Sequence, residues 1–122
     1  MYKRGVLSIL FGLFLLLLPS ALAQITVSGP EQTTVNFGDA ISVTGSVVEA
    51  TDISGFLKYA LDCGETELLA TKSVTLRANV ERSFTETFTV PQAVTGTCTL
   101  HVFVESNGNV QDESRSTPFT IT

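Results

Sequence analysis

The chain has little of the material from which catalytic and metal sites are built. Its 122 residues include one His, two Cys, one Met and no Trp. A zinc site needs four ligands at defined spacing, and a triad needs a nucleophile and a carboxylate around a histidine. His101 and two cysteines fit neither pattern, and no Gly-rich phosphate loop is present. We therefore expect no catalysis, no cofactor and no resident metal. Because no Asn-x-Ser/Thr sequon occurs, N-glycosylation is not expected either.

Positive charge is also scarce. Without its first 23 residues the chain keeps 5 Lys and Arg against 12 Asp and Glu, a net charge of −7. A negative surface opposes binding to nucleic acid or to an anionic membrane. The 99 residues that remain suffice for one domain. The expected partner is a protein, a cell-surface polymer or another copy of this chain.

The N-terminus has the pattern of a secretory signal peptide. Lys3-Arg4 precedes a 14-residue apolar run, Gly5–Leu18, and Ala21-Leu22-Ala23 places small residues where a signal peptidase reads them. The run is shorter than the roughly 20 residues of a membrane-spanning helix. We predict cleavage between Ala23 and Gln24. The chain then divides into a signal peptide, 1–23, and a secreted or cell-surface domain, 24–122.

Two other fates of this segment stay open. It could remain as an uncleaved anchor, in which case the membrane is a partner through this segment only. A pilin-like cut after Gly5 is the other alternative, because a basic pair precedes the apolar run. Pro19 disfavours it, since proline would break the long helix through which pilins assemble.

The mature chain reads as β-structure throughout. It holds 17 Thr and 12 Val, which are β-branched and suit a pleated surface, and apolar residues recur with period two. The expected strands are Ile25–Val27, Thr33–Phe37, Ala40–Val48, Gly55–Cys63, Glu67–Ala70, Val74–Ala78, Ser83–Val90, Gly96–Glu105 and Phe119–Ile121. Asn107-Gly108 signals a hairpin. This pattern predicts an all-β fold, an antiparallel immunoglobulin-like sandwich of about seven to nine short strands. A small open barrel is the alternative.

Glu86 does not fit the alternation of its strand. It stands in phase with Phe84 and Phe88, which would point it into the core. A buried, unpaired carboxylate costs several kcal/mol. We therefore expect an edge strand or a bulge at this position, and a functional buried glutamate is the alternative.

The two cysteines predict a disulfide. Cys63 ends one expected strand and Cys98 begins another, and both lie in phase with the apolar residues. In such a sandwich these strands are antiparallel neighbours, and a secreted chain favours the oxidised pair. The bond would close a loop of 35 residues, worth about 3–4 kcal/mol in the chain-entropy model. Two buried free thiols are the alternative.

The disulfide implies a register. If Cys63 faces Cys98, Ala60 faces His101, Lys58 faces Phe103 and Phe56 faces Glu105, all six on the outer face of that sheet. An exposed apolar patch there can mark a partner surface. The candidate partner surface is Phe56, Lys58, His101 and Phe103. The alternatives are that another segment covers this patch or that the facing is inverted.

Two carboxylate groups could hold Ca²⁺ loosely, because hard cations need several oxygen ligands. One is Asp62, Glu65 and Glu67, beside Cys63; the other is Asp112-Glu113, after the hairpin. Neither matches the spacing of a calcium loop. Solvated loop charge is the favoured interpretation of both.

The stretch Phe37–Val47 resembles the opening of prokaryotic extracellular Ig-like surface modules, bacterial or archaeal, which are similar to macroglobulin-type β-sandwiches. Gly96–Leu100 and Phe119–Thr122 fit the same pattern. The resemblance implies surface exposure and a structural or adhesive role, and it carries no catalytic residues.

The leading hypothesis is a secreted or cell-surface module with a structural, adhesive or protein-binding role. One alternative is a self-assembling fibre subunit in which Ile25–Ser28 or Phe119–Thr122 completes a neighbour's sheet. Others are the N-terminal module of a longer surface protein and, less favoured, a small secreted enzyme or inhibitor.

Overall fold

The structure, a computed structural model, describes residues 23–92 and 94–122. Its strands are β1 (Gln24–Ser28), β2 (Thr34–Val35), β3 (Ala40–Val48), β4 (Ile53–Asp62), β5 (Thr66–Leu76), β6 (Arg82–Thr89), β7 (Gly96–Ser106), β8 (Asn109–Arg115) and β9 (Phe119–Ile121). Among these residues no helix is long and apolar enough to cross a membrane. The predicted signal peptide lies outside the described residues except for Ala23, and Gln24 is the first residue of β1.

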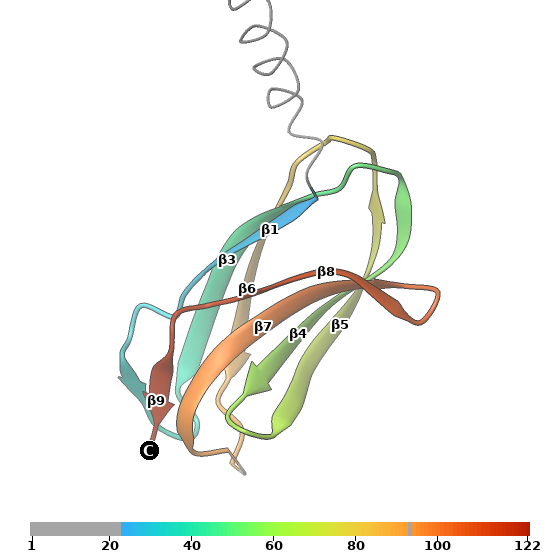
Figure 1. The fold of residues 1–122 in the computed structure, drawn as a ribbon. Helices are drawn as coiled ribbons and strands as arrows, with labels where there is room; N and C mark the ends of the chain where they lie inside the picture. The colour runs from blue at the N-terminus through green and yellow to red at the C-terminus, as the bar shows by residue number, and fades with distance from the viewer. Residues whose placement is uncertain (1–22, 93) are drawn as a thin grey trace, which may run out of the picture.

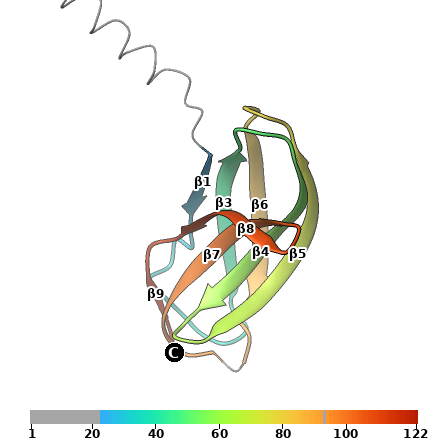
Figure 2. The same ribbon diagram turned by 45° about the vertical axis from the view of Figure 1, so that its right-hand side comes forward.

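The strands form two sheets that pack face to face (Figures 1 and 2). The small sheet has the order β1-β3-β6. The large sheet has the order β2-β9-β7-β4-β5, and β8 also pairs with β7. The short β2–β9 pair is parallel and the other ladders are antiparallel. This arrangement confirms the predicted immunoglobulin-like β-sandwich, and the alternative of an open barrel is wrong.

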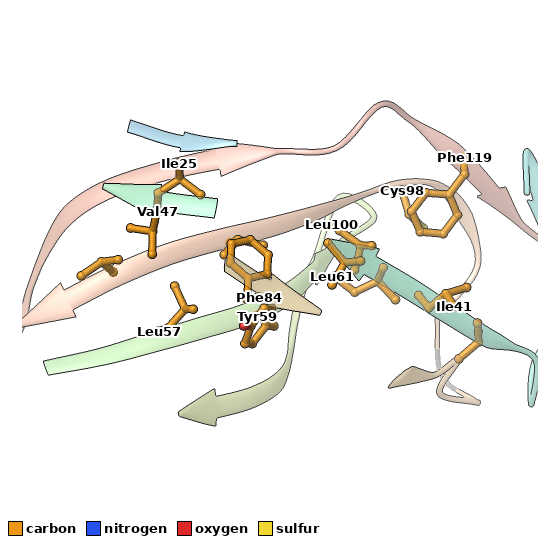
Figure 3. Packing of buried hydrophobic residues seen from close by; sticks show 14 of the residues in the cluster. Ile25, Ile41, Val47, Leu57, Tyr59, Leu61, Phe84, Cys98, Leu100 and Phe119 are labelled. Carbon is orange, nitrogen blue, oxygen red and sulfur yellow. The ribbon is translucent and has the colours of Figure 1, made fainter. Parts of the chain in front are cut away.

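The core lies between the sheets and is built from the inward residues of each strand. On β3, Ile41, Val43 and Val47 are almost completely buried, as the period-two pattern predicts. Aromatic side chains join the sheets at the centre: the Tyr59 ring lies 5.8 Å from that of Phe84 (Figure 3) and 5.4 Å from that of Phe88. Such ring pairs add about 0.5–1.5 kcal/mol beyond their buried area.

Gly45 interrupts the apolar face of β3 for a steric reason. A Cβ atom at this position would lie 1.9 Å from the carbonyl oxygen of Thr26 on β1 and 2.7 Å from Cζ of Phe84. The missing side chain therefore lets β1 and the Phe84 ring approach β3 closely. Glycine is required here by packing and not by a turn.

Two elements differ from the strands expected from the sequence. Residues 66–76 form one strand, β5, where the sequence predicted two shorter pieces. The polar residues at its centre, Thr71-Lys72-Ser73, interrupt the apolar pattern from which one continuous strand could be predicted. They are tolerated because β5 is the edge strand of its sheet. The sequence also predicted no strand at 109–115, where β8 follows the predicted Asn107-Gly108 hairpin.

Glu86 lies on the edge strand of the small sheet, as expected. The β3–β6 ladder runs through it without a bulge. Its carboxylate reaches the rim of the sandwich, where Oε1 lies 3.6 Å from Nζ of Lys72 on β5. Its side chain keeps 27% of its exposure, so the alternative of a functional buried glutamate is wrong for this residue.

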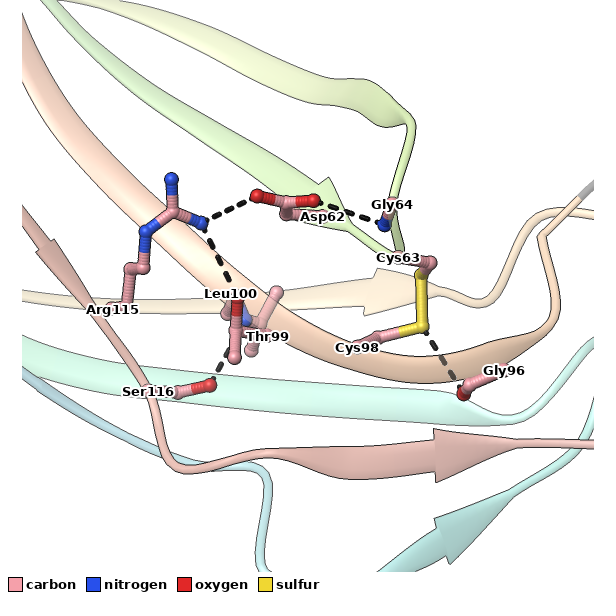
Figure 4. Close-up of a disulfide and its surroundings, with 9 residues drawn as sticks. All are labelled: Asp62, Cys63, Gly64, Gly96, Cys98, Thr99, Leu100, Arg115 and Ser116. Carbon is pink, nitrogen blue, oxygen red and sulfur yellow. Dashed lines mark hydrogen bonds and ion pairs between the residues drawn. A yellow bond between two sulfur atoms is a disulfide. The ribbon is translucent and has the colours of Figure 1, made fainter.

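The predicted disulfide is present. Cys63 and Cys98 are bonded, with Cα atoms 4.2 Å apart (Figure 4). The β4–β7 ladder has the register derived from this bond: Ala60 faces His101, Lys58 faces Phe103, and Phe56 faces Glu105. The bond therefore closes the end of the ladder that forms the middle of the large sheet.

Candidate functional site

The outer face of the large sheet is the surface on which the sequence-predicted partner residues meet. Side chains of β5, β4, β7 and β8 form three rows across it, defined by the strand registers. The rows are Ser73–Phe56–Glu105–Val110, Thr71–Lys58–Phe103–Glu113 and Leu68–Ala60–His101–Arg115. We call these twelve residues, with Asp62, the partner face. The register thus confirms the predicted placement of Phe56, Lys58, His101 and Phe103 on one surface.

The charges of the partner face pair with one another. Nζ of Lys58 lies 2.8 Å from Oε1 of Glu105, and Nη1 of Arg115 lies 2.7 Å from Oδ2 of Asp62 (Figure 4). The Gly64 N–H donates a hydrogen bond to Asp62, and together with Arg115 it holds the pKa of the Asp62 carboxyl below its usual value. These pairs hold each of the two cationic side chains to a carboxylate on another strand.

His101 and Phe103 form the middle of the partner face. Their rings lie 4.9 Å apart with planes inclined by 30°, and Nε2 of His101 lies 2.9 Å from Oε1 of Glu113. The His101 side chain keeps 15% of its exposure and Phe103 is half-buried. The imidazole of His101 thus has the Glu113 carboxylate and the Phe103 ring as neighbours.

The predicted patch is therefore less open than the sequence suggested. Phe56 is exposed by 44%, but Lys58, His101 and Phe103 are half-buried by their own neighbours. Ala60, expected on the surface, is only 1% exposed because its small side chain stands between the larger residues Leu68 and His101 on the flanking strands. The expectation of a patch open at all of these positions was wrong.

Two exposed apolar residues extend the partner face beyond the prediction. Leu68 is 53% exposed and Val110 is 50% exposed. A two-residue turn at Asn107-Gly108 places Val110 opposite Glu105, so the hairpin signal could have found it. Leu68 could not be found in this way, since a register shift beside Ala60 decides which β5 side chain faces outward.

Neither carboxylate group assembles a cation site. Asp62 is engaged by Arg115 and Gly64, while Glu65 and Glu67 are exposed. Asp112 and Glu113 are adjacent on β8 and point to opposite faces of the sheet, because side chains alternate along a strand. Within residues 23–92 and 94–122, no three His, Cys, Asp or Glu side chains stand close enough to hold a metal ion.

A cleft of about 400 Å³ opens between the sheets at the β5 and β6 edges. Leu57, Tyr59 and Phe84 are among its buried lining residues. Burial and the negative charge of Glu86 raise the pKa of the Tyr59 hydroxyl to about 12, so it stays protonated. The Lys72–Glu86 pair crosses from one sheet to the other here, and Nη1 of Arg82 donates to the Thr75 carbonyl at 3.3 Å. Side chains of Lys72, Glu86 and Arg82 therefore span the mouth of the cleft.

No protein-family model matches the chain, and no curated protein does. Solved structures share its fold. Alkylpurine DNA glycosylase AlkC from Pseudomonas fluorescens, bound to DNA containing an abasic site analog, superimposes with a TM-score of 0.62 and 14% identity. The match covers 83% of this chain and 31% of the glycosylase, so this chain spans less than a third of that protein.

Two whole-domain matches are more informative about architecture. The CARDB domain of a Pyrococcus furiosus protein, in complex with di-metal ions, gives a TM-score of 0.53 at 16% identity, covering 84% of this chain and 94% of that domain. A Niemann-Pick type C2 protein from the Japanese carpenter ant gives 0.55 at 13% identity, covering 81% and 89%. At these identities the likeness shows the fold alone, an Ig-like β-sandwich.

Proposed function

We propose that the protein is a secreted or surface-displayed Ig-like module that binds a protein or cell-surface polymer through its partner face and performs no catalysis. The observation that carries this proposal is the exposure of three apolar side chains, Phe56, Leu68 and Val110, around a centre of paired charges and stacked rings. The proposal includes the relation to prokaryotic extracellular modules that the Phe37–Val47 pattern suggests.

The composition of the partner face suits recognition. Aromatic anchors carry a large share of interface energy, and polar groups around them exclude water. Phe56 supplies such an anchor beside the Lys58–Glu105 pair. Because the charges are already paired, a partner that covers them does not bury isolated ions, which is the costly case.

The size of the partner face predicts weak binding by one copy. Four strands about 4.8 Å apart and three rows about 6.8 Å apart make a patch roughly 20 Å across, or about 400 Å². A standard stable interface uses about 800 Å² on each partner. Display of many copies on one surface would raise the total avidity without new contacts. Weak binding by each copy, strengthened by display of many copies, suits an adhesive or architectural module.

Export is supported by two features. The leader pattern before Gln24 predicts processing, and the Cys63–Cys98 bond is of the kind that persists in oxidising compartments. N-terminal mass spectrometry of the protein from its own cells should find Gln24 first. A terminus at Met1 or Val6 would contradict the secreted form and favour an anchored or pilin-like one.

The binding role can be tested by paired substitutions of two exposed phenylalanines. Phe56→Ser removes the anchor of the partner face, whereas Phe37→Ser removes a 60% exposed ring from the turn between β2 and β3. We expect Phe56→Ser to weaken retention of the labelled protein on washed cells or envelope fragments about tenfold or more, the range of an interface anchor. Phe37→Ser should leave it unchanged. Equal losses in both variants would contradict the proposal.

The alternative of a fibre built by strand exchange has less support. Residues 119–121 form β9, which lies between β2 and β7, so its exchange would break two ladders. Residues 24–28 form β1, which is paired with β3. Size-exclusion chromatography at high concentration separates the two functions: we expect a monomer, and a ladder of oligomers would favour the fibre.

A further inference from the structure

A buried carboxylate lies where the two sheets meet at the end of β3. Glu49 directly follows β3 and is 2% exposed. The only two buried side-chain oxygen or nitrogen atoms without a hydrogen-bond partner in the described part of the chain are Oε2 of Glu49 and Oδ2 of Asp112. Both of these atoms therefore belong to acidic side chains, which lie 63 positions apart in the sequence.

The strand geometry aims these two side chains at each other. Glu49 continues the inward phase of Val43 and Val47 on the small sheet. Asp112 lies on β8 directly opposite Val104, whose side chain is buried in the core, so Asp112 also points inward, from the large sheet. Figures 1 and 2 both show β8 crossing toward β1 and β3. The carboxyl pair therefore spans the two layers.

Two ionised carboxylates cannot share such a position at low cost, because burial and mutual repulsion both penalise the charges. Burial first, and then the charge and hydrogen bond of Asp112, raise the pKa of Glu49 from 4.5 to about 7. One proton on the Glu49 carboxyl, donated to Asp112, would satisfy both orphaned oxygens with one hydrogen bond.

We propose that Glu49 and Asp112 share one proton and form a pH-sensitive clasp between the sheets, closed when Glu49 is protonated and broken when both carboxyls are ionised. The two carboxyls lie on the inner side of β8, and the same strand contributes Val110, Glu113 and Arg115 to the partner face on its outer side. The expected effect of the clasp is to hold β8, which is hydrogen-bonded as a strand to β7 alone, against the small sheet.

No described side chain supplies a positive charge that replaces the proton; cleavage before Gln24 would add one, an α-amino group on the residue paired with Val48, next to Glu49. Among the described residues, Asp112 is the one group whose charge acts on the Glu49 carboxyl. Arg77, Glu81 and Asp52, on the loops beside it, are exposed, and Asp52 accepts a hydrogen bond from the Ala78 N–H. Asn79 donates its backbone N–H to the backbone carbonyl of Glu49 at 2.6 Å, and not to the carboxyl. The inward residues that precede Glu49 on β3 are apolar.

The sign of the effect follows from the raised pKa. The folded protein holds a proton that the unfolded chain releases near its ordinary value of 4.5, so the stabilisation is complete below that value and is lost as pH rises through about 7. We expect the melting temperature to fall by at least about 5 °C between pH 5 and pH 8. Asp62 has the opposite effect on stability. Because its pKa is lowered, its contribution is lost as pH falls, below pH 4 and therefore outside this interval.

The test compares melting curves of the wild type and Glu49→Gln from pH 5 to pH 8. The amide keeps the hydrogen bond to Asp112 at every pH, so the fall in melting temperature should disappear and the variant should exceed the wild type at pH 8. Asp112→Asn removes the neighbouring charge and leaves Glu49 buried and titratable, so the fall in melting temperature should shrink in this variant without disappearing. Glu86→Gln, an inward-phase carboxyl on the sandwich rim, is the matched control and should keep the wild-type fall.

A wild-type curve that is flat over this interval overturns the clasp, whether or not either variant folds. A fall of equal size in Glu49→Gln also overturns it. Melting is repeated at pH 8 with Ca²⁺ and with EDTA: a rise with Ca²⁺ in the wild type that is absent in Glu49→Gln would assign the pair to a cation and overturn proton sharing. Local opening is measured by hydrogen exchange of the β8 amides. These amides should exchange faster in the wild type than in Glu49→Gln at pH 8, and at the same rate in both proteins at pH 5.

Discussion

The two outer faces of the sandwich both meet solvent, but they expose different kinds of side chain. The small sheet turns an array of hydroxyls to solvent, and these pair across strands: Thr26 Oγ1 lies 2.9 Å from Ser46 Oγ, and Ser42 Oγ lies 3.1 Å from Thr87 Oγ1. The large sheet turns ion pairs and aromatic rings outward. A solvated sheet needs only the first arrangement, because polar side chains on alternate positions suffice. The additional charges and rings of the large sheet are therefore where we infer binding.

The two sheets also differ in how they are held together. In the small sheet, the absence of a side chain at Gly45 lets β1 and Phe84 pack against β3. In the large sheet, a covalent bond closes the β4–β7 ladder. One sheet thus depends on close approach and the other on a cross-link, and substitutions can separate these two contributions.

The largest effect is expected from Gly45→Ala. The new Cβ would meet a backbone oxygen at 1.9 Å, which β1 can relieve only by moving away. We expect a loss of about 3 kcal/mol or more in the free energy of unfolding, at the upper end for overpacking. Urea denaturation measures it. Thr44→Ala, the outward neighbour, is the control and should cost no more than about 0.5 kcal/mol; equal effects would remove the steric explanation.

The double change Cys63→Ala and Cys98→Ala should cost about 2–4 kcal/mol. The physical reason is the loop of 35 residues that the bond closes in the unfolded chain. Denaturation with and without reductant checks it, since reductant should affect the wild type and not the variant. Two free thiols, or a dimer linked through them, in non-reducing mass analysis would contradict the assignment.

Phe103→Ser should have an intermediate effect, about 1–2 kcal/mol, because the ring is half-buried against His101. A fully exposed ring would cost at most about 0.5 kcal/mol, and a core ring about 3–5 kcal/mol. One melting curve therefore distinguishes three placements. A cost at either extreme would show that the outer face of the large sheet is described wrongly.

The smallest effect is expected on the hydroxyl face. Thr85→Ala, on the solvent side of β6, should change stability by no more than about 0.5 kcal/mol and leave retention on cells unchanged. If Thr85→Ala weakened retention as much as Phe56→Ser, the functional difference between the two faces would be lost.

The large-scale fold could be predicted from period-two patterning, and the β4–β7 register from the cysteines alone. Ala40–Val48 was predicted with its observed bounds, because both of its faces show the pattern clearly. Glu86 was recognised as a misfit, and its edge position explains it.

Glu49 could not be recognised in the same way. It follows the last residue of its strand, and it is buried because β8 crosses from the other sheet. Side-chain placement on the partner face failed for a similar reason: Ala60 is covered by flanking strands, and Leu68 faces outward through a register shift. These features arise from contacts between distant segments, which local patterns do not encode.

The most direct test of the central claim is hydroxyl-radical footprinting of the protein on its own cells, compared with the purified protein. Among residues 23–92 and 94–122, five large apolar side chains are exposed and serve as internal reporters. Phe56, Leu68 and Val110 lie on the partner face, whereas Phe37 and Val80 lie on turns outside it. We expect protection on cells at the first three and none at the last two. Protection at Phe37 and Val80 with Phe56 still reactive would contradict the account.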